Sequence, residues 1–250
     1  MEERITSRKN PLLAGVRKLL SSRSAREAEG RFVSDGTKLL REAVRFCPGL
    51  ETVILSDGVE AEVPDGVRLI RVPEDVMASV SPMATPQGAV FVCRRPPDPP
   101  FVPEKGMILL DGIQDPGNLG TILRTADALG VPAALLEGCA DPYSHKVIRS
   151  SMGAVFRTPP VRTDWETARE RLRSAGILTA ATALDPKAES LRSVDPGSMA
   201  VVIGSEGRGI RREILEQAEK TLIIPMSPSC ESLNAGVAAA IVMWQMGKIR

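Results

Sequence analysis

Strand-like and helix-like segments alternate regularly along the second half of the chain. Short apolar runs typical of buried strands lie near residues 107–112, 133–137, 177–182, 199–204 and 221–225. Segments of helical character lie near residues 118–129, 144–151, 164–175, 211–218 and 232–247. Because parallel neighbours in a sheet are joined by helical crossovers, this alternation predicts an α/β fold whose mainly parallel sheet is covered by helices on both faces.

A proline-dense stretch, residues 95–103, separates that region from the first part of the chain. Proline lacks an N–H donor and interrupts both helices and interior strands, so the stretch predicts a stiff, extended linker. The residues before it predict a small α/β module, with helices near 12–21, 35–46 and 74–80 and strands near 51–56, 68–72 and 88–93. We therefore expect two domains, residues 1–95 and 105–250, joined by a linker at residues 96–104.

The composition is that of an ordered globular protein, with 43% hydrophobic and 25% charged residues. No apolar run approaches the roughly 18 residues that a membrane span needs, so we expect a cytoplasmic protein without membrane contact. Cys47, Cys93, Cys139 and Cys230 lie far apart with no paired spacing, and His145 is the only histidine. This pattern argues against a zinc site and a Ser-His-Asp triad, so we expect free thiols and no metal.

Basic residues are concentrated near the start of the chain. Seven of them and no acidic residue lie between Arg4 and Arg26, although the whole chain carries a net charge of only +1. Such a run can bind RNA phosphates without reading sequence. The candidates for this contact are Arg17, Lys18, Arg23 and Arg26. The alternative is the solvated face of an amphipathic helix whose leucines face a core, and composition alone leaves both interpretations open.

Loops rich in glycine, proline or serine follow three of the predicted strands, at residues 111–118, 204–209 and 224–234. Ligands of parallel α/β sheets sit at the carboxyl ends of the strands, so these loops predict a pocket lined largely by backbone. The glycine spacing at 204–209 is G-x-x-G-x-G, the reverse of the dinucleotide fingerprint, and a Walker A loop is absent. A nucleotide-binding oxidoreductase is therefore disfavoured.

These loops carry motifs that resemble the SpoU/TrmH branch of the SPOUT superfamily, a family of RNA 2′-O-ribose methyltransferases. The motifs read Asn118-x-Gly120-x-x-x-Arg124, then Gly204-Ser-Glu206-Gly-Arg-Gly209, then Ile224-Pro-Met226 and Ser232-Leu-Asn234. The first hundred residues resemble that family's substrate-binding module, which is related to kink-turn-binding ribosomal proteins. The chain departs from the family pattern at Asp35, where glutamate is more usual, and at Gly236, where serine is expected.

The resemblance implies a C-terminal domain with a deep trefoil knot, a smaller N-terminal α/β domain, and the cofactor S-adenosylmethionine (AdoMet). It also assigns roles to individual residues. The implied cofactor-binding residues are Gly204, Ile224, Met226 and Leu233. The implied catalytic residues are Asn118, Arg124, Glu206, Ser232 and Asn234.

Methyl transfer to a ribose requires a weakly acidic hydroxyl to lose its proton. The resemblance implies that Arg124 promotes this step, but a guanidinium is effectively never deprotonated in proteins. We therefore interpret Arg124 as an anchor and charge stabiliser near the phosphate, with water or a phosphate oxygen taking the proton. Arg149, with Ser150, is a further RNA-binding candidate, whereas His145 is interpreted as a surface polar residue.

Simpler structural interpretations exist for several of these positions. Asn118 could serve only as the N-cap of its helix, and Ser232 and Asn234 as the cap and first turn of the last helix. Glu206 could offer its carboxylate to the start of the following helix.

The last helix is apolar on every side, which indicates either the centre of the fold or a subunit interface. The resemblance implies a homodimer through the catalytic domain. We expect an AdoMet-dependent RNA (ribose-2′-O)-methyltransferase acting on ribosomal RNA, with 23S rRNA favoured because a separate N-terminal module is present. The alternatives are a catalytically silent RNA-binding factor for ribosome assembly and a tRNA 2′-O-methyltransferase.

Overall fold

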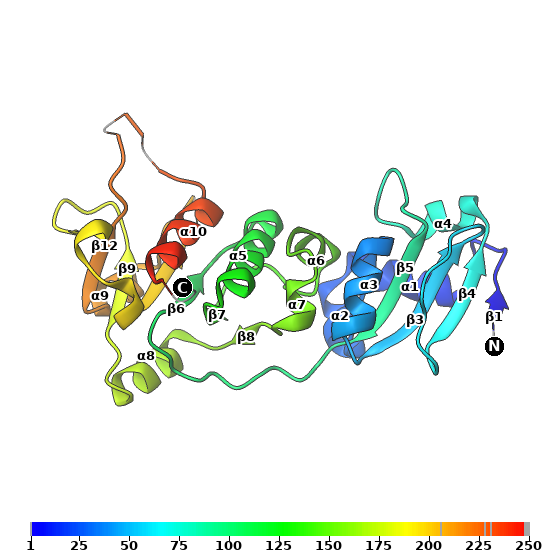
Figure 1. Ribbon diagram of the computed structural model, residues 1–250, viewed down its shortest axis with the longest axis horizontal. Helices are drawn as coiled ribbons and strands as arrows, with labels where there is room; N and C mark the ends of the chain where they lie inside the picture. The colour runs from blue at the N-terminus through cyan, green and yellow to red at the C-terminus, as the bar shows by residue number, and fades with distance from the viewer. Residues whose placement is uncertain (1, 206, 228, 231, 248–250) are drawn as a thin grey trace. The chain divides into compact units, whose positions relative to one another are not determined.

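The computed structural model describes residues 2–205, 207–227, 229–230 and 232–247 of the chain (Figure 1). The chain forms two compact units. The first takes in the residues up to 97 together with 141–157, and the second takes in 98–140 and the chain from 158 onward. The segment 141–157 falls within the expected second domain, and the expected linker at residues 96–104 is divided between the two units after residue 97.

A mixed sheet with the strand order β1-β4-β3-β5-β2 forms the centre of the first unit (Figure 1). Strand β4 is parallel to β1 and β3, whereas β5 is antiparallel to β3 and β2. The strands are β1 (Glu2–Arg4), β2 (Arg31–Asp35), β3 (Leu50–Ser56), β4 (Arg68–Val72) and β5 (Ala89–Arg94). The helices are α1 (Pro11–Ser21), α2 (Arg23–Glu29), α3 (Thr37–Phe46), α4 (Glu74–Val80), α6 (His145–Ser150) and α7 (Ala154–Arg157).

The amphipathic helix expected near 12–21 is α1. Its apolar face, with Leu13, Val16 and Leu19, is buried in a core shared with α4 and the sheet. Strands β1 and β2 were not expected from the sequence. Strand β1 consists of three charged residues at an edge of the sheet, and β2 is buried at four successive positions, so neither shows the apolar alternation of a typical strand.

Aromatic residues attach the segment 141–157 to the rest of the first unit. The ring of Phe32 lies 5.1 Å from that of Tyr143 and 6.1 Å from that of Phe156, measured between centroids. Phe91 makes an edge contact with Phe156. The apolar side of α6 and α7 is therefore part of the core of the first unit.

A parallel sheet with the strand order β10-β12-β9-β11-β6-β7-β8 forms the second unit, as the alternating pattern predicts. The strands are β6 (Met107–Asp111), β7 (Ala133–Leu135), β8 (Val161–Arg162), β9 (Thr179–Thr182), β10 (Glu189–Ser190), β11 (Ala200–Gly204) and β12 (Lys220–Ile223). The α-helices are α5 (Pro116–Leu129), α8 (Trp165–Ser174), α9 (Arg212–Gln217) and α10 (Ala235–Gln245), with 3-10 turns η1 (Leu191–Ser193) and η2 (Pro196–Ser198).

Helices α8 and α9 of the second unit share one core with the sheet, through Trp165, Leu172 and Ile214. Helix α10 packs against α5 and against β11. The helix expected near 144–151 is present as α6, but it belongs to the first unit. Among the described residues, no helix combines the length and the apolar character needed to cross a bilayer.

Candidate active site

A cavity of about 480 Å³ opens at the carboxyl ends of strands in the second unit. Its lining includes all four expected cofactor residues and one expected catalytic residue. These are Gly204, Ile224, Met226 and Leu233, with Ser232. Two of the three predicted loops, at residues 204–209 and 224–234, therefore meet at one place, whereas no residue of the loop at 111–118 lines this cavity.

The cavity walls are mainly apolar, which suits a flat base. Leu184, Ile203 and Leu222 contribute to them, and Thr182 stands at the end of β9. Sequence reasoning missed the wall formed by residues 182–184. The available signal was that this loop also follows an apolar strand of the parallel sheet.

The loop after β11 is closed on itself. Ser205 and Gly209 exchange two backbone hydrogen bonds, of 3.1 and 2.9 Å between nitrogen and oxygen. A Cβ atom added at Gly204 would lie only 2.4 Å from the carbonyl carbon of Gly209, so the loop requires glycine at this position. The expected catalytic residue Glu206 lies outside the described residues.

Asn118 does not cap helix α5, which is a correction of the simpler interpretation. The helix begins two residues earlier, at Pro116, and Asp115 is its N-cap, accepting a 2.7 Å hydrogen bond from the backbone N–H of Asn118. The side chain of Asn118 instead accepts a hydrogen bond of 3.0 Å from the side-chain nitrogen of Asn234. Two of the expected catalytic residues are thus in direct contact.

Asn234 serves as a cap as well. It is the N-cap of α10, and its side-chain oxygen accepts from the backbone N–H of Val237 at 3.2 Å. A second cavity, of about 440 Å³, is lined by Asn118 and Asn234 together with Thr121 and Trp244. Gly236, where the family pattern expects serine, also lines it, and a Cβ there would lie 3.1 Å from the Asn234 side-chain oxygen.

Arg124 lies one helical turn beyond Thr121 on α5, with an exposed side chain. It lines neither cavity. It also forms no hydrogen bond or ion pair with the part of the chain that the structure describes.

The basic residues near the start of the chain are largely paired within the first unit. The described ion pairs are Arg4–Asp57, Arg8–Asp75, Lys18–Glu29, Arg23–Glu27 and Arg26–Asp141. Arg17 donates to the backbone oxygen of Arg8. Most of these contacts are exposed, so they are weak and can exchange for phosphate contacts.

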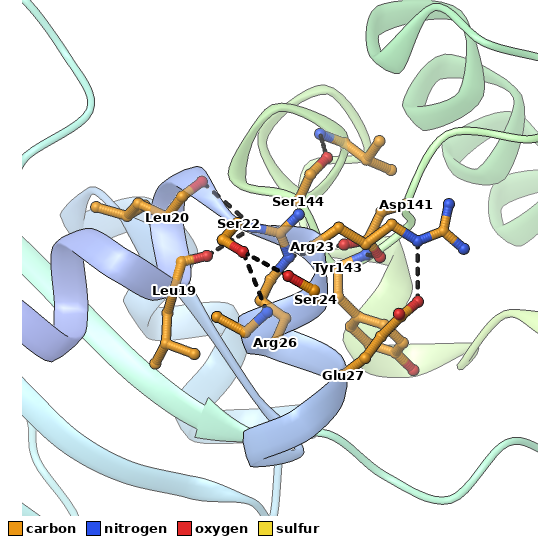
Figure 2. A network of polar contacts seen from close by, with 12 residues as sticks. Leu19, Leu20, Ser22, Arg23, Ser24, Arg26, Glu27, Asp141, Tyr143 and Ser144 are labelled. Carbon is orange, nitrogen blue, oxygen red and sulfur yellow. Dashed lines mark hydrogen bonds and ion pairs between the residues drawn. The ribbon is translucent and has the colours of Figure 1, made fainter.

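The RNA-binding prediction for Arg26 is wrong. Its side chain and that of Asp141 are each only 8% exposed, and the two are joined at 2.7 Å. A second guanidinium nitrogen donates to the backbone oxygen of Leu19 at 2.6 Å (Figure 2). Because the guanidinium is buried and already neutralised, it cannot reach a phosphate.

Arg149 forms an ion pair with the buried Asp35 at 3.4 Å, while 38% of its own side chain stays exposed. Burial raises the pKa of Asp35, and the charge of Arg149 only partly opposes this effect. His145 is partly buried rather than a surface residue. Burial lowers the pKa of His145, and the neighbouring charges of Lys146 and Arg26 add to the effect.

The fold and the cavity define an α/β protein with a mainly apolar cavity at the carboxyl ends of parallel strands. Residues 105–244 match the SpoU rRNA Methylase family, and residues 10–90 match the MRM3-like substrate binding domain. The chain belongs to the SpoU rRNA methylase family. This match confirms the prediction of an RNA 2′-O-methyltransferase.

Several relatives are similar over nearly the whole chain. The 23S rRNA (guanosine(2553)-2′-O)-methyltransferase RlmP of Bacillus subtilis is 33% identical over 98% of this chain and 99% of its own. The AdoMet-bound rRNA methyltransferase of Sinorhizobium meliloti is 28% identical, with a TM-score of 0.85 and coverage of 98% and 97%. The SpoU methyltransferase AviRb of Streptomyces viridochromogenes, in complex with the cofactor AdoMet, is 27% identical, with a TM-score of 0.80 and coverage of 95% and 97%.

Proposed function

We propose that this protein transfers a methyl group from AdoMet to a ribose 2′-hydroxyl of ribosomal RNA, with 23S rRNA as the favoured substrate. One observation carries the proposal. The cavity at the sheet edge gathers every expected cofactor residue, and the contact between Asn118 and Asn234 joins two expected catalytic residues of the same unit.

The residues of the cavity fit AdoMet. Gly204, Ile224 and Leu233 offer backbone groups, and apolar side chains such as Met226 supply walls for the adenine. The absence of a Cβ at Gly204 allows the loop to fold tightly against its own backbone. When bound, AdoMet supplies an electrophilic methyl group on a positively charged sulfur. Ser232 lies at the same cavity and can donate or accept a hydrogen bond there.

The chain's own residues position the ribose. Arg124 is exposed and permanently protonated, so it anchors an RNA phosphate and stabilises negative charge as the hydroxyl ionises. The proton leaves to water or to a phosphate oxygen, because a guanidinium cannot accept it. The side-chain nitrogen of Asn234 donates to the side-chain oxygen of Asn118, and this hydrogen bond orients both amide groups.

We further propose a homodimer through the catalytic domain and a C-terminal trefoil knot. Helix α10 leaves Val237, Ile241 and Trp244 exposed by 48%, 38% and 74%, on a helix that otherwise packs into the second unit. An apolar surface of this kind is typical of a subunit interface. The packing of α10 on α5 and β11 is consistent with the knot that the family motifs imply.

The proposed setting is the cytoplasm, without a metal. All four cysteines are free thiols, which suits a reducing compartment. The favoured substrate follows from the similarity to a 23S rRNA methyltransferase and from the substrate-binding domain matched at residues 10–90. The alternative substrate is tRNA, and the transfer assay distinguishes it from rRNA.

The test is methyl transfer from tritiated AdoMet to unmodified RNA. We expect label in 23S rRNA, at a nucleotide whose 3′ phosphodiester resists alkali because its 2′-hydroxyl is methylated. Label confined to tRNA would favour the tRNA enzyme. Tight AdoMet binding in calorimetry without label in any RNA, or no AdoMet binding, would contradict the proposed function.

A further inference from the structure

Asp111 is a buried acid at the edge of the cofactor loop. It is the last residue of β6, it is 1% exposed, and it is the register partner of Gly204 across the neighbouring strand β11. Gly204 also lines the larger cavity, together with Ser205, Arg208, Gly209 and Ile210 of the loop that follows it. The carboxylate of Asp111 therefore lies beside the start of that loop.

The same carboxylate holds the end of the loop. One oxygen of Asp111 accepts from the backbone N–H of Arg211 at 2.8 Å, and the other accepts from the Arg211 Nε at 2.7 Å. Arg211 directly follows Ile210, the last loop residue on the cavity wall, and it is the N-cap of α9. Both carboxylate oxygens of the buried Asp111 therefore accept hydrogen bonds from Arg211.

Arg211 has a second, weaker attachment. Its outer nitrogen donates to Glu137 at 2.7 Å, but Glu137 is 51% exposed and Arg211 is 40% exposed. Solvent screens that pair, whereas the contact with Asp111 involves a side chain that is almost fully buried. The inner contact is therefore the stronger constraint on the loop.

Neither Asp111 nor Arg211 lines the cavity, so neither belongs to the residues expected to bind the cofactor. Between them, the Ser205 and Gly209 backbones close the loop with their two hydrogen bonds. Asp111 and Arg211 therefore hold this loop in place at both of its ends. A loop that is already ordered in the free protein loses little conformational entropy when a ligand binds.

We propose that Asp111 is a positioning residue, which clamps the loop at residues 204–210 through Arg211 in the shape that receives AdoMet. This inference rests on the proposed function for the identity of the ligand. The clamp itself is a property of the free protein, and it can be measured without any ligand.

The first measurement is AdoMet affinity by calorimetry on the full chain. We expect Asp111→Ala to raise the Kd on the order of tenfold to a hundredfold, because two hydrogen bonds to an arginine are lost. Asp111→Asn keeps an oxygen for one of these bonds, so its loss should be smaller. Glu137→Gln is the matched control, and it should change the Kd by no more than about twofold.

The second measurement is trypsin cleavage after Arg208, inside the loop, without AdoMet. We expect faster cleavage in Asp111→Ala, intermediate cleavage in Asp111→Asn and wild-type cleavage in Glu137→Gln. If wild type does not bind AdoMet but the cleavage order holds, the proposed function fails and the clamp stands. Unchanged cleavage and unchanged Kd in both Asp111 variants, or an equal effect of Glu137→Gln, would overturn the clamp.

Discussion

The side-chain nitrogen of Asn234 donates to the side-chain oxygen of Asn118 at 3.0 Å, across 116 positions of sequence. The other end of the Asn234 amide accepts from the backbone of Val237 in the first turn of α10. Because that cap fixes which end of the amide faces Asn118, the helix start and the site are coupled through one side chain. Asn234 is therefore both the cap of α10 and a partner of Asn118, so the structural and the catalytic interpretation both apply to it.

Two substitutions at Asn234 separate these roles. Asn234→Asp keeps an oxygen for the cap but removes the donor toward Asn118, so we expect methyl transfer to fall at least about tenfold with little change in the melting temperature. Asn234→Ala also removes the cap, which should lower the free energy of unfolding by roughly a further 0.5–2 kcal/mol. Thermal melts and single-turnover transfer rates measure the two effects. A fully active Asn234→Asp would show that capping is its main role.

Arg124→Ala should abolish methyl transfer while leaving AdoMet affinity within a few fold. Arg124 is exposed on α5 and does not line the larger cavity, so its loss removes a group that serves the RNA. Arg124→Lys keeps the charge but not the planar fork, and we expect partial activity. Calorimetry and transfer assays on the same preparations give both values. A collapse of AdoMet affinity together with the rate would place Arg124 in the cofactor site.

Arg26→Gln should destabilise the first unit rather than weaken RNA binding. Removing Arg26 takes the positive charge away from the buried carboxylate of Asp141, which costs about 3–5 kcal/mol. Arg23→Gln is the matched control on the same helix, since its pair with Glu27 is exposed and contributes only about 0.3–0.5 kcal/mol (Figure 2). Denaturant unfolding compares the two variants. Equal stability of both would mean that the buried pair adds nothing to the fold.

The exposed part of the basic run gives a separate prediction. Replacing Arg17, Lys18 and Arg23 together by glutamine should weaken rRNA binding and flatten the plot of log affinity against log salt. Each lost phosphate contact should reduce the magnitude of this negative slope by about 0.7 to 0.9. Titration of labelled rRNA at several salt concentrations measures it, and AdoMet affinity serves as the control. An unchanged slope would support the interpretation as a solvated helix face.

The sequence was sufficient for the parallel sheet and for two of the loops that line the cavity, because both depend on local pattern, whereas the wall at residues 182–184 was missed. Apolar strands alternating with helices predict the sheet, and the loops at Gly204, Ile224 and Leu233 must then meet at its carboxyl edge. Charge pairing was not predictable in the same way. Arg26 and Asp141 are 115 positions apart, and no periodicity connects an arginine of α2 with an acid ahead of α6.

The attachment of residues 141–157 to the first unit was missed for the same reason. Phe32 and Phe91 show only that two strands are apolar, and neither indicates that Phe156 completes their core. The alternative interpretation of Asn118 as an N-cap was wrong because asparagine suits both a cap and a site, and the helix start at Pro116 depends on the neighbouring Asp115. Where a residue type suits two roles, as asparagine does here, only the structure shows which role the residue has.

The buried Asp35 gives a prediction on pH. Its carboxylate is shielded from solvent, one of its oxygens has no hydrogen-bond partner among the described residues, and burial raises its pKa from the usual 3.8. Since the folded protein holds this proton to higher pH than the unfolded chain does, the contribution of Asp35 to stability falls as pH rises from about 3.8 through the raised pKa.

Asp35→Asn removes that cost, so at neutral pH we expect it to increase the free energy of unfolding on the order of 1 kcal/mol. The difference between the variant and wild type should shrink as the pH falls, because the wild-type carboxyl then becomes neutral as well. Arg149→Gln is the matched control, since it removes the charge that lowers the Asp35 pKa and should destabilise at neutral pH. Unfolding curves at pH values from about 4 to about 8 give the free energy of unfolding of wild type, Asp35→Asn and Arg149→Gln. A neutral-pH loss of stability in Asp35→Asn would mean that the ion pair with Arg149 outweighs the burial of the charge.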